Sequence, residues 1–93
     1  MVKHIVLYKF KDGVDKEAAI QTIDSVLTPL VGKIPGLKHL EVRLAFQGMD
    51  YALYSEFESK QALLDYREHP AHVEAKSQFF HFLESRVAAD YEV

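Results

Sequence analysis

The sequence predicts a single α+β domain, a four-stranded antiparallel sheet with helices on one of its faces. Four segments of the 93 residues alternate apolar and polar positions with the period of two that is typical of strands. In two further regions, one between the first and second strands and one between the third and fourth, apolar residues recur every three or four positions. This order is the ferredoxin-like βαββαβ arrangement. Because no linker or repeat interrupts it, we expect one domain over residues 1–93.

Composition is that of a soluble globular protein and argues against several classes of partner. The chain is 48% hydrophobic and 27% charged. It has no cysteine, and its first residues lack the apolar run and cleavage site of a secretory signal, so we expect a cytoplasmic location. No stretch approaches the roughly 20 apolar residues of a membrane span. The net charge of −3 comes without a basic stripe, so we expect neither nucleic acid nor membrane as a partner.

The first strand, at residues 3–10, is apolar on both of its faces. One face carries His4, Val6, Tyr8 and Phe10, and the other carries Ile5 and Leu7. We expect such a strand to be covered by other parts of the protein, or by a partner, on both sides of its sheet.

A helix is predicted after the turn "KDGVD". Asp15 is a plausible N-cap, because its side chain can accept hydrogen bonds from the free N–H groups of the first turn. The apolar face of the helix consists of Ile20, Ile23, Leu27 and Leu30. Pro29 predicts a kink in the last turn, and Gly32 is the natural stop.

The middle of the chain carries two strands joined by the loop "QGMD". Residues 37–46 alternate between an apolar and a wetter face. The apolar positions are Leu40, Val42, Leu44 and Phe46, and the wetter ones are Lys38, His39, Glu41 and Arg43. The third strand is predicted at residues 51–58.

The last third of the chain is predicted to hold two helical segments and a strand. Ser59 can cap a short helix that ends at Tyr66. Pro70 can begin a longer helix that ends near Arg86, because proline is well suited to the first helical turn. Residues 87–93 then form the fourth strand.

The two-sided first strand predicts self-association. Both helical segments lie on one face of a ferredoxin-like sheet, so the other face has no cover within the chain. An exposed apolar patch of that size favours a partner. We therefore expect a homodimer in which two sheets pack face to face as a dimeric α/β barrel, with a cavity between each sheet and its helices. A monomer with a long ligand groove is the alternative.

Four segments that together span nearly the whole chain carry a family resemblance. They are "VKHIVLYKFKDG", "IPGLKHLEV", "YALYSEFESKQALLDYREHPAHVEA" and "DYEV". In them the chain resembles the stress-responsive dimeric α/β-barrel (Dabb) domain family. The resemblance implies a small ferredoxin-like chain that forms a dimeric barrel, and it leaves the activity open.

Within that family, "HPAHV" resembles the catalytic segment of a plant polyketide cyclase, which closes a linear thioester by an aldol reaction. A tyrosine precedes the segment at the same spacing. The resemblance implies that His72 is a general base, that Tyr66 orients the substrate carbonyl, and that His4 lines the pocket.

The residue types agree with proton abstraction next to a carbonyl group. A histidine can accept a proton near neutral pH, and a phenol can donate a hydrogen bond to a developing enolate. Tyr66 and His72 are six residues apart, about 600° around a continuous helix, so only a bend at Pro70 lets them converge on one ligand. A helical projection places His72 on an inward stripe, whose other members are Val73, Phe79, Phe80 and Leu83.

Each candidate also has a reading that involves no ligand. His72 could be a hydrogen-bonded core imidazole, and Tyr66 could serve packing alone. The further candidates for contact with a ligand are Val6, Tyr8, His69 and Phe79. For Tyr8 and Phe79 the alternative is the core or the dimer interface. For His69 it is capping the helix that Pro70 begins.

Three classes of function follow for a small hydrophobic, phenolic or β-keto ligand. The first is a cofactor-free enzyme of the cyclase or isomerase type, or a cofactor-free monooxygenase. The second is a binding module without turnover, and the third is a structural stress-response oligomer.

We expect neither a cofactor nor a metal. Zinc requires three or four ligands, and only His69 and His72 are suitably spaced.

Overall fold

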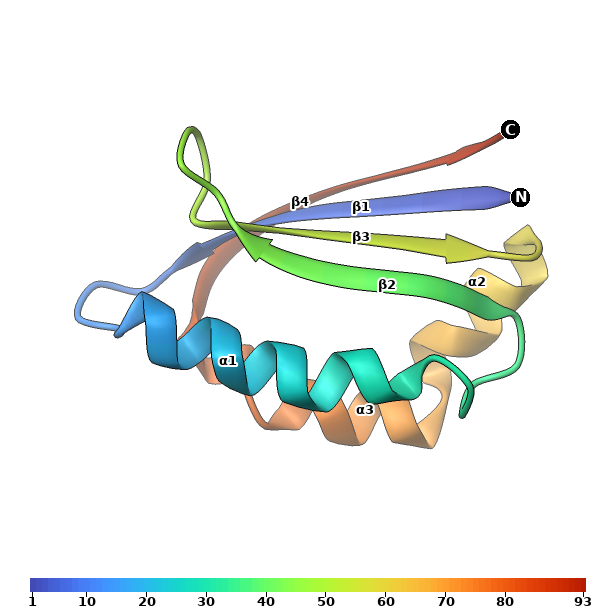
Figure 1. Cartoon of the computed structure of the whole chain (residues 1–93), viewed down its shortest axis with the longest axis horizontal. Coiled ribbons are helices and arrows are strands. Elements are labelled where there is room, and N and C mark those ends of the chain that lie inside the picture. The colour runs from blue at the N-terminus through green and yellow to red at the C-terminus, as the bar shows by residue number, and fades with distance from the viewer.

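The computed structural model describes all 93 residues and confirms the α+β fold. The elements are β1 (Val2–Phe10), α1 (Lys16–Leu27), a 3-10 turn η1 (Thr28–Leu30), β2 (Leu37–Leu44), β3 (Tyr51–Phe57), α2 (Lys60–Glu68), α3 (Pro70–Ser77), a 3-10 turn η2 (Phe80–Phe82) and β4 (Leu83–Glu92). All neighbouring strands are antiparallel, in the order β2-β3-β1-β4. Figure 1 shows the helices gathered on one side of this sheet. None of them is long and apolar enough to cross a membrane.

Helix α1 begins where the sequence predicts, and its helical geometry changes at the expected place near Pro29, although the α-helix itself stops short of Gly32. The Asp15 side chain accepts a hydrogen bond from the Ala18 amide at 3.2 Å, which satisfies a free donor of the first turn. The α-helix ends at Leu27, and Pro29 lies in the first turn of η1, where its missing N–H costs nothing. The helix buries its apolar stripe against the sheet.

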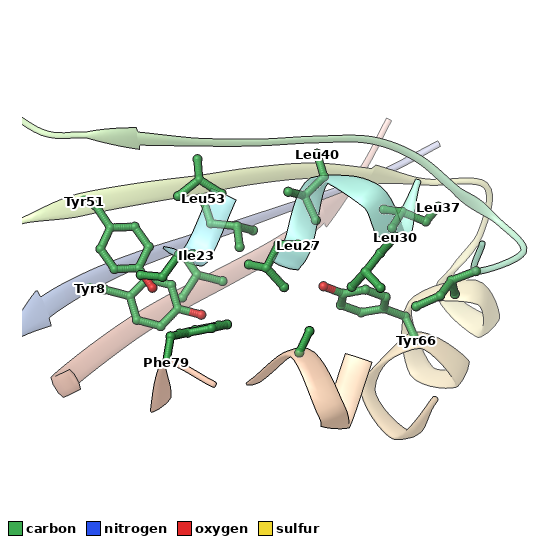
Figure 2. Close-up of a cluster of buried hydrophobic side chains, with 14 of the residues drawn as sticks. Tyr8, Ile23, Leu27, Leu30, Leu37, Leu40, Tyr51, Leu53, Tyr66 and Phe79 are labelled. Atoms are coloured by element: carbon green, nitrogen blue, oxygen red, sulfur yellow. The ribbon is translucent and has the colours of Figure 1, made fainter. Parts of the chain in front are cut away.

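The core fills the space between the helices and the inner face of the sheet. Figure 2 shows side chains from the strands and the helices meeting there. Tyr51 stacks on Tyr8 with ring centroids 4.4 Å apart and on Phe10 at 5.1 Å. His4, Val6, Tyr8 and Phe10 are buried on this face, so one of the two faces predicted for the first strand belongs to the protomer's own core.

The opposite face of the sheet, here called the outer sheet face, carries no helix (Figure 1). On β1 it presents Ile5 and Leu7. In the strand register, Leu7 lies between Ala52 and Val87, and Ile5 lies between Tyr54 and Ala89. Leu7 is 38% exposed and Val87 is 61% exposed. The centre of the face is therefore an apolar patch open to solvent in the single chain, and the ion pair of Lys3 and Glu56 lies beside it.

The helix predicted for residues 70–86 ends earlier than expected, so this prediction is wrong at its C-terminal end. Helix α3 ends at Ser77, and β4 begins at Leu83. Residues that were predicted to extend the helix instead pair with β1, for example Ser85 with Lys9 and Arg86 with Tyr8. The helical periodicity is local, whereas this pairing depends on a strand that is more than 70 residues away.

Two of the side chains placed on the inward stripe are exposed, namely Val73, which lies within α3, and Phe80, which lies beyond its end. Phe79 has a backbone conformation outside the helical region, with φ −136° and ψ −10°, and this turns the chain out of the helix. Phe79 itself is buried, while Leu83 is partly buried.

Strand β2 is two residues shorter than predicted, and Phe46 is fully exposed on the loop that follows it. Asp50 closes this loop. Its carboxylate accepts a hydrogen bond from the Phe10 amide at 2.8 Å and pairs with Lys16 at 2.8 Å. The carbonyl oxygen of Asp50 accepts a hydrogen bond from the Ala45 amide at 2.9 Å. This bond closes the loop, and the pairing of β2 with β3 ends before Phe46.

Candidate functional site

A sharp bend between α2 and α3 brings Tyr66 and His72 together. His69 stands between the helices in an extended conformation, with φ −62° and ψ 132°. Its ring Nδ1 accepts a hydrogen bond from the Ala71 amide at 3.1 Å, so His69 caps α3, and Pro70 occupies the first helical turn. Across the bend, the rings of Tyr66 and His72 stack with centroids 3.9 Å apart and planes 26° apart.

His72 is held in a defined orientation. Its Nδ1 lies 3.3 Å from the carbonyl oxygen of Arg67, the residue after Tyr66. Because a carbonyl only accepts hydrogen bonds, this contact places the imidazole proton on Nδ1. The lone pair of Nε2 is then free to accept a proton or a hydrogen bond from a ligand.

The electrostatics of His72 favour its neutral form. The residue is only 8% exposed, and burial lowers the pKa of His72 from its ordinary 6.5 to about 4. The positive charge of Lys76, one helical turn further on, lowers this pKa in the same direction. At neutral pH, His72 is therefore an uncharged imidazole.

Tyr66 is buried against the aromatic core. Its ring meets Phe57 edge-on at 5.0 Å. Burial raises the pKa of the Tyr66 hydroxyl above its ordinary value, so the hydroxyl stays protonated and can donate a hydrogen bond. Figure 2 shows this hydroxyl directed into the molecule, with the Tyr8 hydroxyl pointing toward it from the other end of the cluster and Leu27 above the space between them.

That space is a cavity of about 180 Å³ between the inner face of the sheet and the helices. Its lining combines an apolar floor with polar groups from both layers. The lining residues are His4, Tyr8, Leu27, Leu53, Tyr66, Arg67, His72, Lys76, Phe79 and Arg86. Five of the seven sequence-predicted site residues are in this lining, namely His4, Tyr8, Tyr66, His72 and Phe79.

His4 is fixed on the cavity wall by a carboxylate. Its Nδ1 is hydrogen-bonded to Asp90, which lies opposite His4 in the register of β1 and β4. The other oxygen of Asp90 pairs with Arg67 at 2.9 Å. Asp90 therefore links β4 to α2 at one end of the cavity.

Two candidate residues lie outside the lining. Val6 is 0% exposed and packs in the core beside the cavity. His69 serves as the N-cap of α3. Both support the site indirectly in this geometry, Val6 by filling the layer under it and His69 by making the bend.

Sequence reasoning missed three charged lining residues, Arg67, Lys76 and Arg86. Lys76 had a local signal, since it follows His72 by four residues and so shares its helix face. Arg86 had none, because it reaches the cavity only through the pairing of β4 with β1, which sets it opposite Tyr8.

A second, larger cavity of about 420 Å³ lies between α2 and the end of β4. The ion pair of Arg67 and Asp90 forms part of its wall. Half of the lining residues are hydrophobic and the other half are charged. Its lining residues are Val2, Lys60, Leu63, Leu64, Arg67, Asp90, Tyr91 and Glu92. It holds no histidine, so the smaller cavity is the better candidate for acid–base chemistry.

The buried His72 makes stability depend on pH. Because its folded-state pKa is about 4 and its ordinary value is 6.5, the unfolded chain binds more protons within that window. Stability is therefore lost as the pH falls from about 6.5 toward 4. We expect His72 to account for a loss of about 2 kcal/mol between about pH 7.5 and pH 5. Urea unfolding of His72→Gln should lack this part of the dependence.

The exposed His81 provides the matched control, because it lies outside the cavity. His81→Gln should keep the pH dependence of the wild type. Equal pH dependence in the wild type and in His72→Gln would contradict a buried neutral imidazole.

Comparisons with known proteins agree with this geometry. A protein from Bacteroides fragilis, described as dimeric, ferredoxin-like and of unknown function, superposes with a TM-score of 0.89, is 35% identical and matches 99% of this chain and 95% of its own. A stress-response A/B barrel domain-containing protein of Arabidopsis thaliana is 35% identical over 98% of this chain and 88% of its own length. The olivetolic acid cyclase of Cannabis sativa is 30% identical over 97% of this chain and 94% of its own. The profile of the stress responsive A/B barrel (Dabb) domain matches residues 2–93, and the chain belongs to that family.

Proposed function

We propose that the cavity binds a small carbonyl compound and that His72 and Tyr66 move a proton next to its carbonyl group, in a cofactor-free reaction of the cyclase or isomerase type. The observation that carries the proposal is the stacked Tyr66 and His72 pair on one cavity wall. One member of the pair presents a free ring nitrogen and the other a protonated hydroxyl. The similarity to a cyclase along nearly the full length supports the reaction type.

The chemistry proceeds through an enolate. The Tyr66 hydroxyl donates a hydrogen bond to the carbonyl oxygen, and Nε2 of His72 takes the proton from the adjacent carbon. The electrons of the broken C–H bond move onto the oxygen. In a cyclase the enolate carbon then bonds to a second carbonyl carbon, and the proton on His72 goes to the new alkoxide. In an isomerase the proton returns to a different carbon.

The Arg67 carbonyl has a part in this step. Its contact with Nδ1 strengthens as the imidazole becomes positive, because a hydrogen bond from a charged donor is stronger than one from a neutral donor. His72 with a pKa of about 4 is a weak base, so the enolate must be stabilised by the Tyr66 hydroxyl for the proton to move.

The test measures by NMR how fast deuterium from deuterium oxide replaces the protons next to the carbonyl group of a β-keto thioester. His72→Gln is expected to lower the exchange rate by about 10²–10⁴-fold, the usual contribution of a general base. Tyr66→Phe removes only the hydroxyl and should lower the rate while the fold is kept. His81→Gln is the control and should exchange at the wild-type rate.

The low pKa of His72 favours a second candidate, a binding module in which the neutral imidazole only hydrogen-bonds its ligand. In that case His72→Gln weakens ligand binding, and the wild type exchanges protons no faster than the variant. Exchange that depends on His72 would exclude the binding module.

We also propose a homodimer joined through the outer sheet face. Apolar side chains on that face are open to solvent in the single chain, and the similar Bacteroides fragilis protein is described as dimeric. Packing two such sheets against each other would bury Leu7 and Val87. The cavity lies on the opposite side of the sheet, so each protomer would keep its own site.

A further inference from the structure

Two of the three cations that line the cavity have no carboxylate partner. Arg67 is paired with Asp90 at 2.9 Å. Lys76 and Arg86 take part in none of the eight ion pairs of the chain. Each lies over an aromatic ring instead, with Lys76 Nζ 5.4 Å from the Phe80 centroid and Arg86 Cζ 6.0 Å from that of Tyr8.

These two cations reach the cavity from different layers of the fold. Lys76 belongs to α3, one turn beyond His72, and Arg86 belongs to β4, opposite Tyr8. Like charges that face one cavity repel each other, and the repulsion is relieved when an anion lies between them. The protein as a whole carries a net charge of −3, so the positive charge at this cavity is a local feature.

We propose that the ligand of this cavity carries a carboxylate, which Lys76 and Arg86 bind, while its carbonyl oxygen accepts a hydrogen bond from Tyr66 or its phenol hydroxyl donates one to Nε2 of His72. This inference rests on the proposed function and narrows its substrate class to small carboxylates with a keto or phenol group. The cavity, at about 180 Å³, is below the roughly 300–1,000 Å³ of pockets for drug-sized ligands, which favours a compact molecule.

A bound carboxylate would also change the base. Burial is the main cause of the low pKa of His72, and the positive charge of Lys76 lowers this pKa further. A carboxylate that pairs with Lys76 offsets this charge and raises the pKa of His72. The ligand would thereby remove the contribution of Lys76 to the low pKa of His72, while burial would still lower it.

Calorimetric titration with two matched probes tests the inference. 4-Hydroxybenzoate and 4-hydroxybenzamide have the same size and the same phenol, and they differ in the charge of one group. At low salt, we expect the wild type to bind the benzoate at least about tenfold more tightly than the benzamide. Lys76→Met and Arg86→Met should each reduce that preference several-fold, and the double variant should remove it.

Two controls separate charge from structural damage. Lys60→Met removes a lysine that is paired with Glu92 outside this cavity, and it should keep the wild-type preference. Lys76→Arg keeps the charge and should also keep the preference for the benzoate. If Lys76→Arg loses the preference as fully as Lys76→Met, the charge is not what selects the ligand, and the inference is overturned.

The outcomes distinguish this inference from the proposed function. If the wild type binds both probes equally and His72→Gln weakens both, the site stands and the carboxylate inference falls. If the wild type binds neither probe, the carboxylate inference falls, and the proton-exchange experiment alone decides the proposed function. Preference for the benzoate that persists in the double variant also overturns the inference, because the anion is then bound elsewhere.

Discussion

Replacing Val6 by aspartate is expected to unfold the protein. Val6 is 0% exposed in the centre of β1, between Leu53 of β3 and Ala88 of β4. A carboxylate there would have no charged partner, and burying it costs several kcal/mol, on the order of the roughly 5–15 kcal/mol that stabilises a whole domain. We expect circular dichroism to show no cooperative thermal transition for Val6→Asp.

Val6→Ala is the control for size. It removes volume from the same place without adding charge, so it should stay folded with a lower melting temperature. A Val6→Asp variant with the melting temperature of the wild type would show that this face of β1 is not the core.

Replacing Leu7, the next residue, by aspartate should dissociate the dimer and leave the protomer folded. Leu7 is 38% exposed in the centre of the outer sheet face, so the protomer can hydrate a carboxylate there. In a face-to-face dimer the same carboxylate would be buried without a partner, which costs several kcal/mol. Sedimentation of the variant should show a 10.7 kDa species, whereas the wild type should sediment at twice that mass.

Leu64→Asp is the matched control, because Leu64 is a similarly exposed leucine on α2, on the helical side of the sheet. It should leave the mass of the wild type unchanged. If the wild type itself sediments at 10.7 kDa, or if Leu7→Asp keeps the mass of the wild type, the outer sheet face is not the interface.

Val6 and Leu7 illustrate which features of the fold can be predicted from neighbouring residues alone. Adjacent residues of a strand point to opposite faces, so alternation alone shows that Val6 and Leu7 differ in environment. It does not show which one faces the helices. Which face is buried depends on tertiary packing, because His4, Val6 and Tyr8 lie on the side of the sheet against which α1 packs its buried residues.

Elements with local capping signals were predicted well. Asp15, Ser59 and Pro70 each mark a helix start, and each helix begins at the following residue or at the proline itself. The failure lies after Ser77, where no cap or break stands in the sequence. Pairing with β1 overrides the helical period there, and it brings Arg86 to the cavity.

The candidate site shows the same division. Tyr66 and His72 could be paired from the sequence because a proline stands between them and forces a bend. The expected reason for the inward position of His72 was partly wrong, since Val73 and Phe80 of the proposed stripe are exposed. His72 is buried instead by the stacked ring of Tyr66 and the Arg67 carbonyl.

The most direct test of the proposed site is a crystal structure with a small neutral phenolic ketone, such as 4-hydroxyacetophenone. The account predicts the compound in the cavity between the sheet and α3, with its ketone oxygen about 2.6–3.2 Å from the Tyr66 hydroxyl and its methyl carbon facing Nε2 of His72. Density for the compound only in the larger cavity beside Leu63 and Tyr91, with the Tyr66 and His72 pair untouched, would contradict it.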